Sequence, residues 1–218
     1  MDSFEWYMFG VGILILIFMM SRALPYSVIL FNPTAIRSSF LPGRSLKKSN
    51  KHIESLMSQI IEMGYEPAGL LREQKPLWGK VDGIAYFKKG AQEYIIVIPL
   101  YGRFAMYVET VFDTGHIILT GNRSFQTIDN DQLTQCSLTG ADLSTILEYH
   151  REQVAACAAD NAVPRTDYSG QVILGFTHPY YSIPAIQKRM RLAGLLSLVL
   201  PLVLIALLVV TTLDAIAD

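Results

Sequence analysis

Charged residues are scarce in this 218-residue chain, at 17% of the total, whereas about 25% is typical of soluble domains. The deficit lies at the two ends, because all 18 lysines and arginines fall between Arg22 and Arg191, together with 15 of the 19 acids. This middle region is only weakly basic and contains no clustered basic stripe, so we expect no nucleic-acid partner.

Cysteine is also scarce. Cys136 and Cys157 lack C-x-x-C spacing and have no neighbouring His, which disfavours a metal or redox centre. A disulfide would need an oxidising compartment, and we expect two reduced thiols. The chain has no Walker A, Rossmann, G-x-S-x-G or kinase motif, and we expect no cofactor. No metal-ligand spacing such as H-x-x-H joins the four histidines, which are His52, His116, His150 and His178.

The longest apolar run is Leu192 to Leu213, 22 residues without a charged side chain. As a helix it would be about 33 Å long, which matches the roughly 30 Å hydrocarbon core of a bilayer. A buried helix of a soluble domain rarely keeps every face apolar over six turns, so we expect a transmembrane helix. Pro201, in the middle of the run, is tolerated in lipid and predicts a kink.

A second apolar run of 16 residues begins at Trp6. Trp6 and Tyr7 suit one membrane interface as aromatic anchors, and Arg22 can reach the other. The alternative is a cleaved signal peptide, which starts with basic residues. Here the acidic Asp2 and Glu5 come first and the basic residues follow, so we expect a retained helix with its N-terminus outside.

Basic residues flank both apolar runs on the side that faces the middle of the chain. The positive-inside rule therefore predicts a two-pass protein of the cell (inner) membrane, with both termini outside and residues 22–191 in the cytoplasm. The expected membrane-interface residues are Trp6, Tyr7, Arg22, Lys188, Arg189 and Arg191.

Between the apolar runs, hydrophobic periodicity predicts helices over residues 51–63 and 141–159, the second with Thr139 as N-cap and Asp142 at the N3 position. Alternating and apolar segments predict strands, and a glycine-containing turn at 88–91 joins the first two. The expected strands cover residues 80–87, 93–100, 103–112 and 116–121, with further strands at 124–128 and 171–176. A last helix is expected to begin at Pro184 and to continue into the second span.

This order predicts an α+β fold: an antiparallel β-meander of four to six strands packed by two helices, with one transmembrane helix at each end. The expected division is an N-terminal transmembrane helix (1–23), a linker (24–50), a soluble cytoplasmic domain (51–182) and a juxtamembrane segment with the C-terminal transmembrane helix (183–214). Residues 26–31 are too short to span a bilayer and would lie in the interface or pack on the domain.

The segment from Glu109 to Asn122 reads ETVFDTGHIILTGN: an acidic-aromatic strand, a D-x-G turn and a strand that ends in Thr-x-Asn. It resembles a pattern in bacterial membrane-anchored proteins of unknown function, in which a G-[FY]-x-P-x-G element precedes the segment and a helix with a late His follows. Residues 64–69 and His150 match these two elements. The resemblance supports the architecture and implies no activity.

Three residues are candidates for acid-base chemistry: His150, Asp113 and Glu109. His150 lies on the apolar stripe of its predicted helix with no acid on the same face, which favours a structural role. Asp113 belongs to a single D-T-G sequence at a predicted hairpin turn, whereas aspartic proteases pair two such carboxyls. We therefore predict no catalytic site and retain the three only as candidates.

The leading hypothesis is a membrane-tethered binding or accessory domain that recruits a protein partner or forms a homo-oligomer as a small subunit of a membrane complex. A membrane-bound enzyme with an unrecognised site would instead need a pocket that holds two or more of the candidates with shifted pKa values. A lipid or small-ligand binder would need a sizeable apolar cavity. The apolar runs contain no ionisable residue, which disfavours a transporter.

Overall fold

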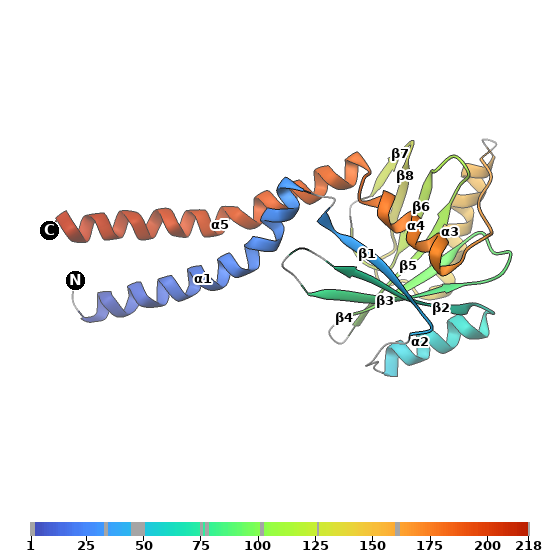
Figure 1. Ribbon diagram of the computed structural model, residues 1–218, viewed down its shortest axis with the longest axis horizontal. Helices are drawn as coiled ribbons and strands as arrows, with labels where there is room; N and C mark the ends of the chain where they lie inside the picture. Colours follow the sequence, from blue (N-terminus) through green and yellow to red (C-terminus); the bar gives the residue numbers. More distant parts are fainter. Residues whose placement is uncertain are drawn as a thin grey trace. The chain divides into compact units, whose positions relative to one another are not determined.

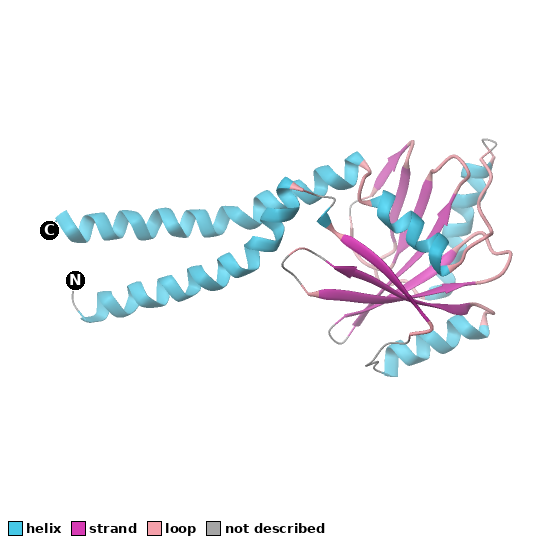
Figure 2. Ribbon diagram, viewed as in Figure 1, coloured by secondary structure: helices cyan, strands magenta, loops and turns pink. Residues whose placement is uncertain are grey.

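The computed structural model describes residues 3–32, 35–44, 51–74, 76, 79–100, 103–125, 127–159 and 162–217. The chain forms two compact units. One unit contains the terminal helices and comprises Met1–Arg37, Lys75–Gly79 and Pro184–Asp218. The other comprises Ser38–Gln74 and Lys80–Ile183 and is a mixed α+β domain (Figure 2).

The first unit is an antiparallel pair of helices, α1 (Ser3–Phe31) and α5 (Pro184–Ala217), with both chain termini at the same end of the pair (Figure 1). Gly12 allows a close approach, because a Cβ atom there would lie 3.1 Å from Leu208 Cδ2. Both helices are long and apolar enough to cross a membrane, judged by length and composition.

Helix α1 is longer than the sequence analysis expected. It continues through Pro25 to Phe31, so residues 24–31 are helical rather than part of a linker. This extension lengthens the apolar segment to 23 residues, Phe9–Phe31. Helix α5 begins at Pro184, as predicted, and contains Pro201.

The expected membrane-interface residues lie on these two helices. Trp6 and Tyr7 are exposed near the start of α1, and Trp6 contacts Phe9 edge to face at a ring separation of 6.1 Å. Arg22 is on the later part of α1. The three basic residues of α5 lie in its first turns, with Lys188 and Arg191 exposed and Arg189 partly exposed.

The α+β unit is built on one eight-stranded sheet rather than the four to six strands expected. Its strand order is β1-β2-β3-β4-β5-β6-β8-β7, and all described pairs are antiparallel except β6 with β8. The strands are β1 (Arg37–Pro42), β2 (Glu66–Gln74), β3 (Lys80–Phe87), β4 (Tyr94–Leu100), β5 (Arg103–Val111), β6 (Ile117–Gly121), β7 (Ile128–Asn130) and β8 (Leu133–Ser137).

The central meander from β3 to β6 matches the prediction, including the turn at 88–91, where Gly90 has a φ of 78°. Strands β1, β2 and β8 were not predicted, and the strand expected at 124–128 shares only Ile128 with β7. Strand β1 lies where a linker was expected, and β2 includes Pro67 and Gly69, which are rare in regular strands. The register of β2 shifts between these two residues, so a bulge accommodates them.

Two helices pack on one face of the sheet, α2 (Lys51–Glu62) and α3 (Leu143–Ala158). Both were predicted, but the N-cap of α3 is Asp142, whose Oδ1 accepts a hydrogen bond from the Thr145 amide at 2.9 Å, so placing Thr139 there was wrong. The core beneath these helices joins side chains from six elements: Leu56, Ile60, Leu70, Ile84, Tyr86, Ile95, Val97, Met106, Val108, Leu143, Ile146 and Leu147.

A further helix, α4 (Gly170–Tyr180), covers the opposite face of the sheet (Figure 1). A strand was expected at residues 171–176, and this prediction was wrong. A short apolar run such as Val-Ile-Leu-Gly-Phe fits either structure, and only its packing partners decide between them. Ile173 is fully buried here, and Tyr180 donates a hydrogen bond to Gln135 Oε1 at 2.8 Å.

Helix α4 begins in direct contact with β1. A Cβ atom at Gly170 would lie 1.9 Å from the ring of Phe40, so only glycine fits unless Phe40 moves. Gly175, one and a half turns later in the same helix, has no atom within 4 Å of its Cβ position.

We therefore predict that Gly170→Ala lowers the thermal unfolding midpoint of the full chain in nonionic detergent. Gly175→Ala is the matched control. It should leave the midpoint unchanged or raise it, because alanine is favoured over glycine inside a helix by about 1 kcal/mol. Adding Phe40→Leu to Gly170→Ala should recover part of the loss. Equal midpoints for the two alanine variants would contradict the close contact.

Candidate functional site

His150 is fully buried between α3 and the sheet. Its Nε2 lies 2.9 Å from Thr110 Oγ1 on β5, and its Nδ1 lies 2.9 Å from Thr120 Oγ1 on β6. Thr110 donates its hydroxyl hydrogen to the Gln92 carbonyl at 2.8 Å. Thr110 must therefore accept from the imidazole, which leaves Nδ1 to accept from Thr120.

This arrangement holds His150 as the neutral Nε2–H tautomer. Burial lowers the pKa of His150 to about 4, although the charge of Glu93 opposes the shift. Both ring nitrogens are occupied by the two threonines and the residue is inaccessible to solvent. The geometry is that of a cross-link between a helix and two strands.

Glu109 is buried on the other face of the sheet. Alternating residues of a strand point to opposite faces, so Glu109 faces away from His150, whose partner is the adjacent Thr110. Tyr94 is its cross-strand neighbour on β4. Neither Glu109 Oε1 nor Tyr94 Oη makes a hydrogen bond with a described residue. Burial raises the pKa of Glu109 to about 7, with the nearby Tyr94 hydroxyl opposing the rise and Glu73 adding to it.

Asp113 is exposed in the turn between β5 and β6. Its Oδ1 accepts a hydrogen bond from the Val163 amide at 3.1 Å, and its own amide donates to the Val163 carbonyl at 2.9 Å. Gly115 completes the turn with a φ of 85°. The D-T-G sequence thus forms a turn that holds a neighbouring loop.

The structure therefore does not bring the three candidates together. His150 and Glu109 lie on opposite faces of the sheet, and Asp113 lies in a turn at one end of β5. Within the described part of the chain, no group of three or more His, Cys, Asp or Glu residues is placed to hold a metal ion. Cys136 and Cys157 form no disulfide with a described residue, and each is partly buried.

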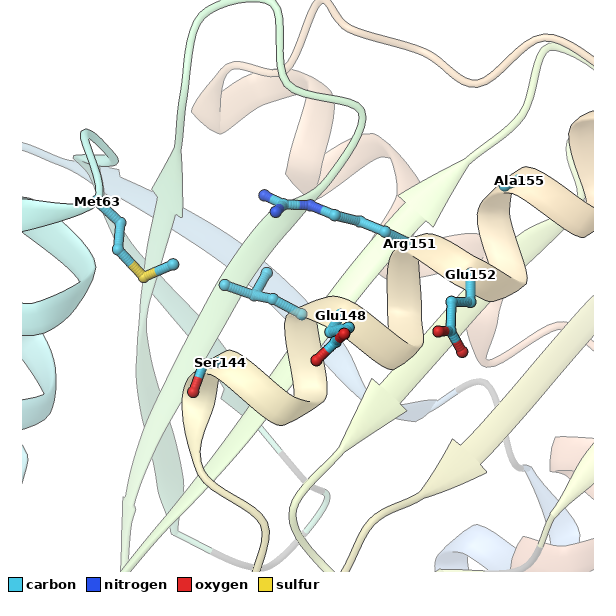
Figure 3. A pocket seen from close by; sticks show the side chains of 7 residues that line it. Met63, Ser144, Glu148, Arg151, Glu152 and Ala155 are labelled. Atoms are coloured by element: carbon cyan, nitrogen blue, oxygen red, sulfur yellow. The ribbon is translucent and has the colours of Figure 1, made fainter.

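A surface pocket of about 490 Å³ lies between the end of α2 and the exposed side of α3 (Figure 3). One face of α3 forms most of it, because its residues recur every three or four positions. Met63, just after α2, completes the lining, which otherwise consists of Ser144, Leu147, Glu148, Arg151, Glu152 and Ala155. In Figure 3, the guanidinium of Arg151 extends in the direction of Met63, whereas the carboxylates of Glu148 and Glu152 point downward in the view.

Arg151 is held in place by a buried carboxylate. Its Nη2 and Nε lie 2.6 and 3.1 Å from Glu93 Oε1, and the Glu93 side chain is only 5% exposed. Tyr65, also buried, donates a hydrogen bond to the same carboxylate oxygen, and Arg151 Nη2 lies 3.4 Å from its hydroxyl. Burial alone would raise the pKa of Glu93, but the hydrogen bonds from Tyr65 and Arg151 lower it below its usual value.

This cluster was not identified from the sequence. Tyr65, Glu93 and Arg151 come from the end of α2, the start of β4 and the middle of α3, and nothing in their spacing links them. The available signal was the position of Glu93, which directly precedes the apolar segment Tyr94–Val97 and therefore lies close to the core.

Comparisons with known proteins leave the site to be interpreted from its geometry. No family model, no curated protein and no solved structure matches the chain.

The buried side chains of Glu109 and His150 have opposite effects on the pH dependence of stability. Glu109 keeps its proton up to about pH 7 in the folded state but loses it near pH 4.5 when unfolded, so its contribution to stability falls as the pH rises between these values. His150 has a folded pKa of about 4 and an unfolded value of 6.5, so its contribution falls as the pH drops through that window. Between about pH 4.5 and 6.5 the two slopes largely cancel.

We predict that Glu109→Gln raises the free energy of unfolding at pH 8, by up to about 3 kcal/mol from the shift in pKa. The gain should disappear toward pH 4, below the unfolded pKa of 4.5, where wild-type Glu109 is largely protonated in both states. Urea unfolding in nonionic detergent between pH 4 and 8 measures the difference. The exposed Asp113→Asn is the control and should follow the wild-type profile. A pH-independent difference between Glu109→Gln and wild type would contradict the raised pKa.

Proposed function

We propose that this protein is a membrane-tethered binding or accessory protein, in which a two-helix anchor presents the α+β domain to a protein partner of a membrane complex. The observation that carries the proposal is the pocket between α2 and α3. It lies on the surface, has an apolar component and a charged rim, and is held in shape by the contacts of Arg151 with the buried Glu93 and Tyr65.

The proposed anchor consists of α1 and α5. They are apolar, antiparallel and closely packed, and both chain termini lie at the same end of the pair. Every Lys and Arg of the chain falls between Arg22 and Arg191. These features support a two-pass arrangement in the inner membrane, with both termini outside and residues 22–191 in the cytoplasm. The bacterial inner membrane also agrees with the resemblance of residues 64–150 to bacterial membrane-anchored proteins.

A binding role is favoured over catalysis by the placement of the candidate residues. A general base needs access to substrate and a partner that orients it. His150 is neutral, buried and bonded through both nitrogens, and Glu109 is buried on the opposite face of the sheet. Three accessible charged residues instead border the pocket on α3, and a polar rim of this kind is typical of a recognition surface.

The topology makes a direct prediction. An alkaline phosphatase fusion at Asp218 should be active, because the enzyme folds only outside the cytoplasm, whereas an insertion fusion at Asn161 should be inactive. Phosphatase activity normalised to fusion-protein abundance measures both. The reverse pattern would show the inverted topology, and activity at both sites would contradict the two-pass arrangement.

The binding role predicts that the full chain, extracted in a mild nonionic detergent, elutes with a stoichiometric protein partner or as a defined homo-oligomer. Size-exclusion chromatography with light scattering gives the mass of the complex after subtraction of the detergent. A matched extraction in a denaturing ionic detergent should release the monomer. A monomer in both detergents would contradict the proposal.

A further inference from the structure

Three charged residues line the pocket between α2 and α3: Glu148, Arg151 and Glu152. Among the described residues, Arg151 is the one basic side chain that lines it, and the buried carboxylate of Glu93 pairs with it at 2.6 Å. Glu148 and Glu152 are exposed, and neither makes an ion pair with a residue that the structure describes. Among the described residues the pocket therefore offers two exposed carboxylates without an ion-pair partner, while the Lys88 ammonium lies at its edge on the Met63 carbonyl.

The same pocket has apolar surface between these charges. Leu147 is buried at its base, while Met63 and Ala155 line it from α2 and α3 with part of their surface exposed. A volume of about 490 Å³ falls within the range of small binding pockets. It accommodates a few side chains of a partner rather than an extended protein surface.

The pocket is also preorganised. Lys88 donates a hydrogen bond to the Met63 carbonyl at 3.0 Å, and the Arg151 guanidinium is held by Glu93 and Tyr65. Groups that are already held in their bound positions lose little conformational freedom when a partner binds, which favours affinity.

We propose that this pocket binds a short basic and apolar segment of the partner protein, with lysine or arginine side chains opposite Glu148 and Glu152 and an apolar side chain against Leu147 and Met63. The inference rests on the proposed binding function and names the chemistry of the partner. An acidic or phosphorylated segment fits poorly, because Arg151 is already neutralised and the two glutamates repel anions.

The spacing of the glutamates constrains the segment. Glu148 and Glu152 are one helical turn apart, about 6 Å along the axis of α3. Two basic residues match this distance when they are four positions apart on a helix or two positions apart on an extended strand, which rises about 3.3 Å per residue.

The test uses the full chain in native membranes, with the photo-crosslinking residue p-benzoylphenylalanine in place of Ala155. The matched control carries it at Ala156, which is also exposed on α3 but does not line the pocket. Mass spectrometry identifies the attached segment. We expect a protein segment with two or more Lys or Arg residues at the stated spacing next to an apolar residue, attached from Ala155 and not from Ala156.

Charge reversal supplies the second arm. Glu148→Lys/Glu152→Lys should reduce the yield of the crosslink from Ala155 about tenfold. The reason is that two ion pairs at the rim of the pocket are lost and the new lysines repel the basic segment. Glu66→Lys/Asp131→Lys introduces the same change in net charge at exposed positions outside the pocket and should leave the yield unchanged. Equal yields in the two double variants would overturn the inference.

The remaining outcomes are also decisive. An acidic or uncharged segment, a phospholipid, or no crosslink from Ala155 would overturn the pocket assignment. A second copy attached through its own basic residues 44–51 would meet the criterion, whereas attachment through another part of it would not. A partner that co-purifies without a crosslink from Ala155 rejects the pocket and retains the binding function. A chain that is monomeric in mild detergent rejects both.

Discussion

The constraint on which the α+β domain depends is that both faces of its sheet are buried. Helices α2 and α3 cover one face and α4 covers the other, so the central residues of β4, Tyr94 to Val97, are all buried. A polar group in such a sheet must find its partners inside the protein. His150 finds its partners by bridging Thr110 and Thr120. Glu109 is adjacent to Thr110 but lies on the other face, where its Oε1 has no hydrogen-bond partner among the described residues and its pKa is raised.

Glu93 is the other buried carboxylate, and its hydrogen-bond partners differ from those of Glu109. Glu93 lies at the edge of the buried region, where Tyr65 and Arg151 satisfy it, and the outer part of Arg151 reaches the surface. A buried carboxylate with a paired guanidinium orients the side chain that it holds, because breaking the pair would leave an uncompensated charge. The interior thereby shapes the pocket on α3, and the position of Arg151 is set by residues that lie far from it in the sequence.

Much of the fold could be predicted from local patterns, and the failures have physical causes. The meander from β3 to β6 has strong alternation and clear turns, and α2 and α3 have long apolar stripes. Strand β2 contains Pro67 and Gly69, and α4 is a short apolar run that fits helix or strand, so neither carries a decisive local signal. Helix α1 was expected to end before Pro25, but the helix tolerates this proline and continues to Phe31.

The sequence by itself determined the two long apolar terminal segments, the confinement of every basic residue between them, and the mixed α+β class, because these follow from composition and periodicity along the chain. The tertiary structure alone decided that His150, Glu109 and Asp113 lie apart, and that Tyr65, Glu93 and Arg151 meet beside a pocket. The physical reason is that side-chain convergence depends on which faces of which elements pack together. That packing is set by contacts between residues dozens of positions apart, which no local pattern records.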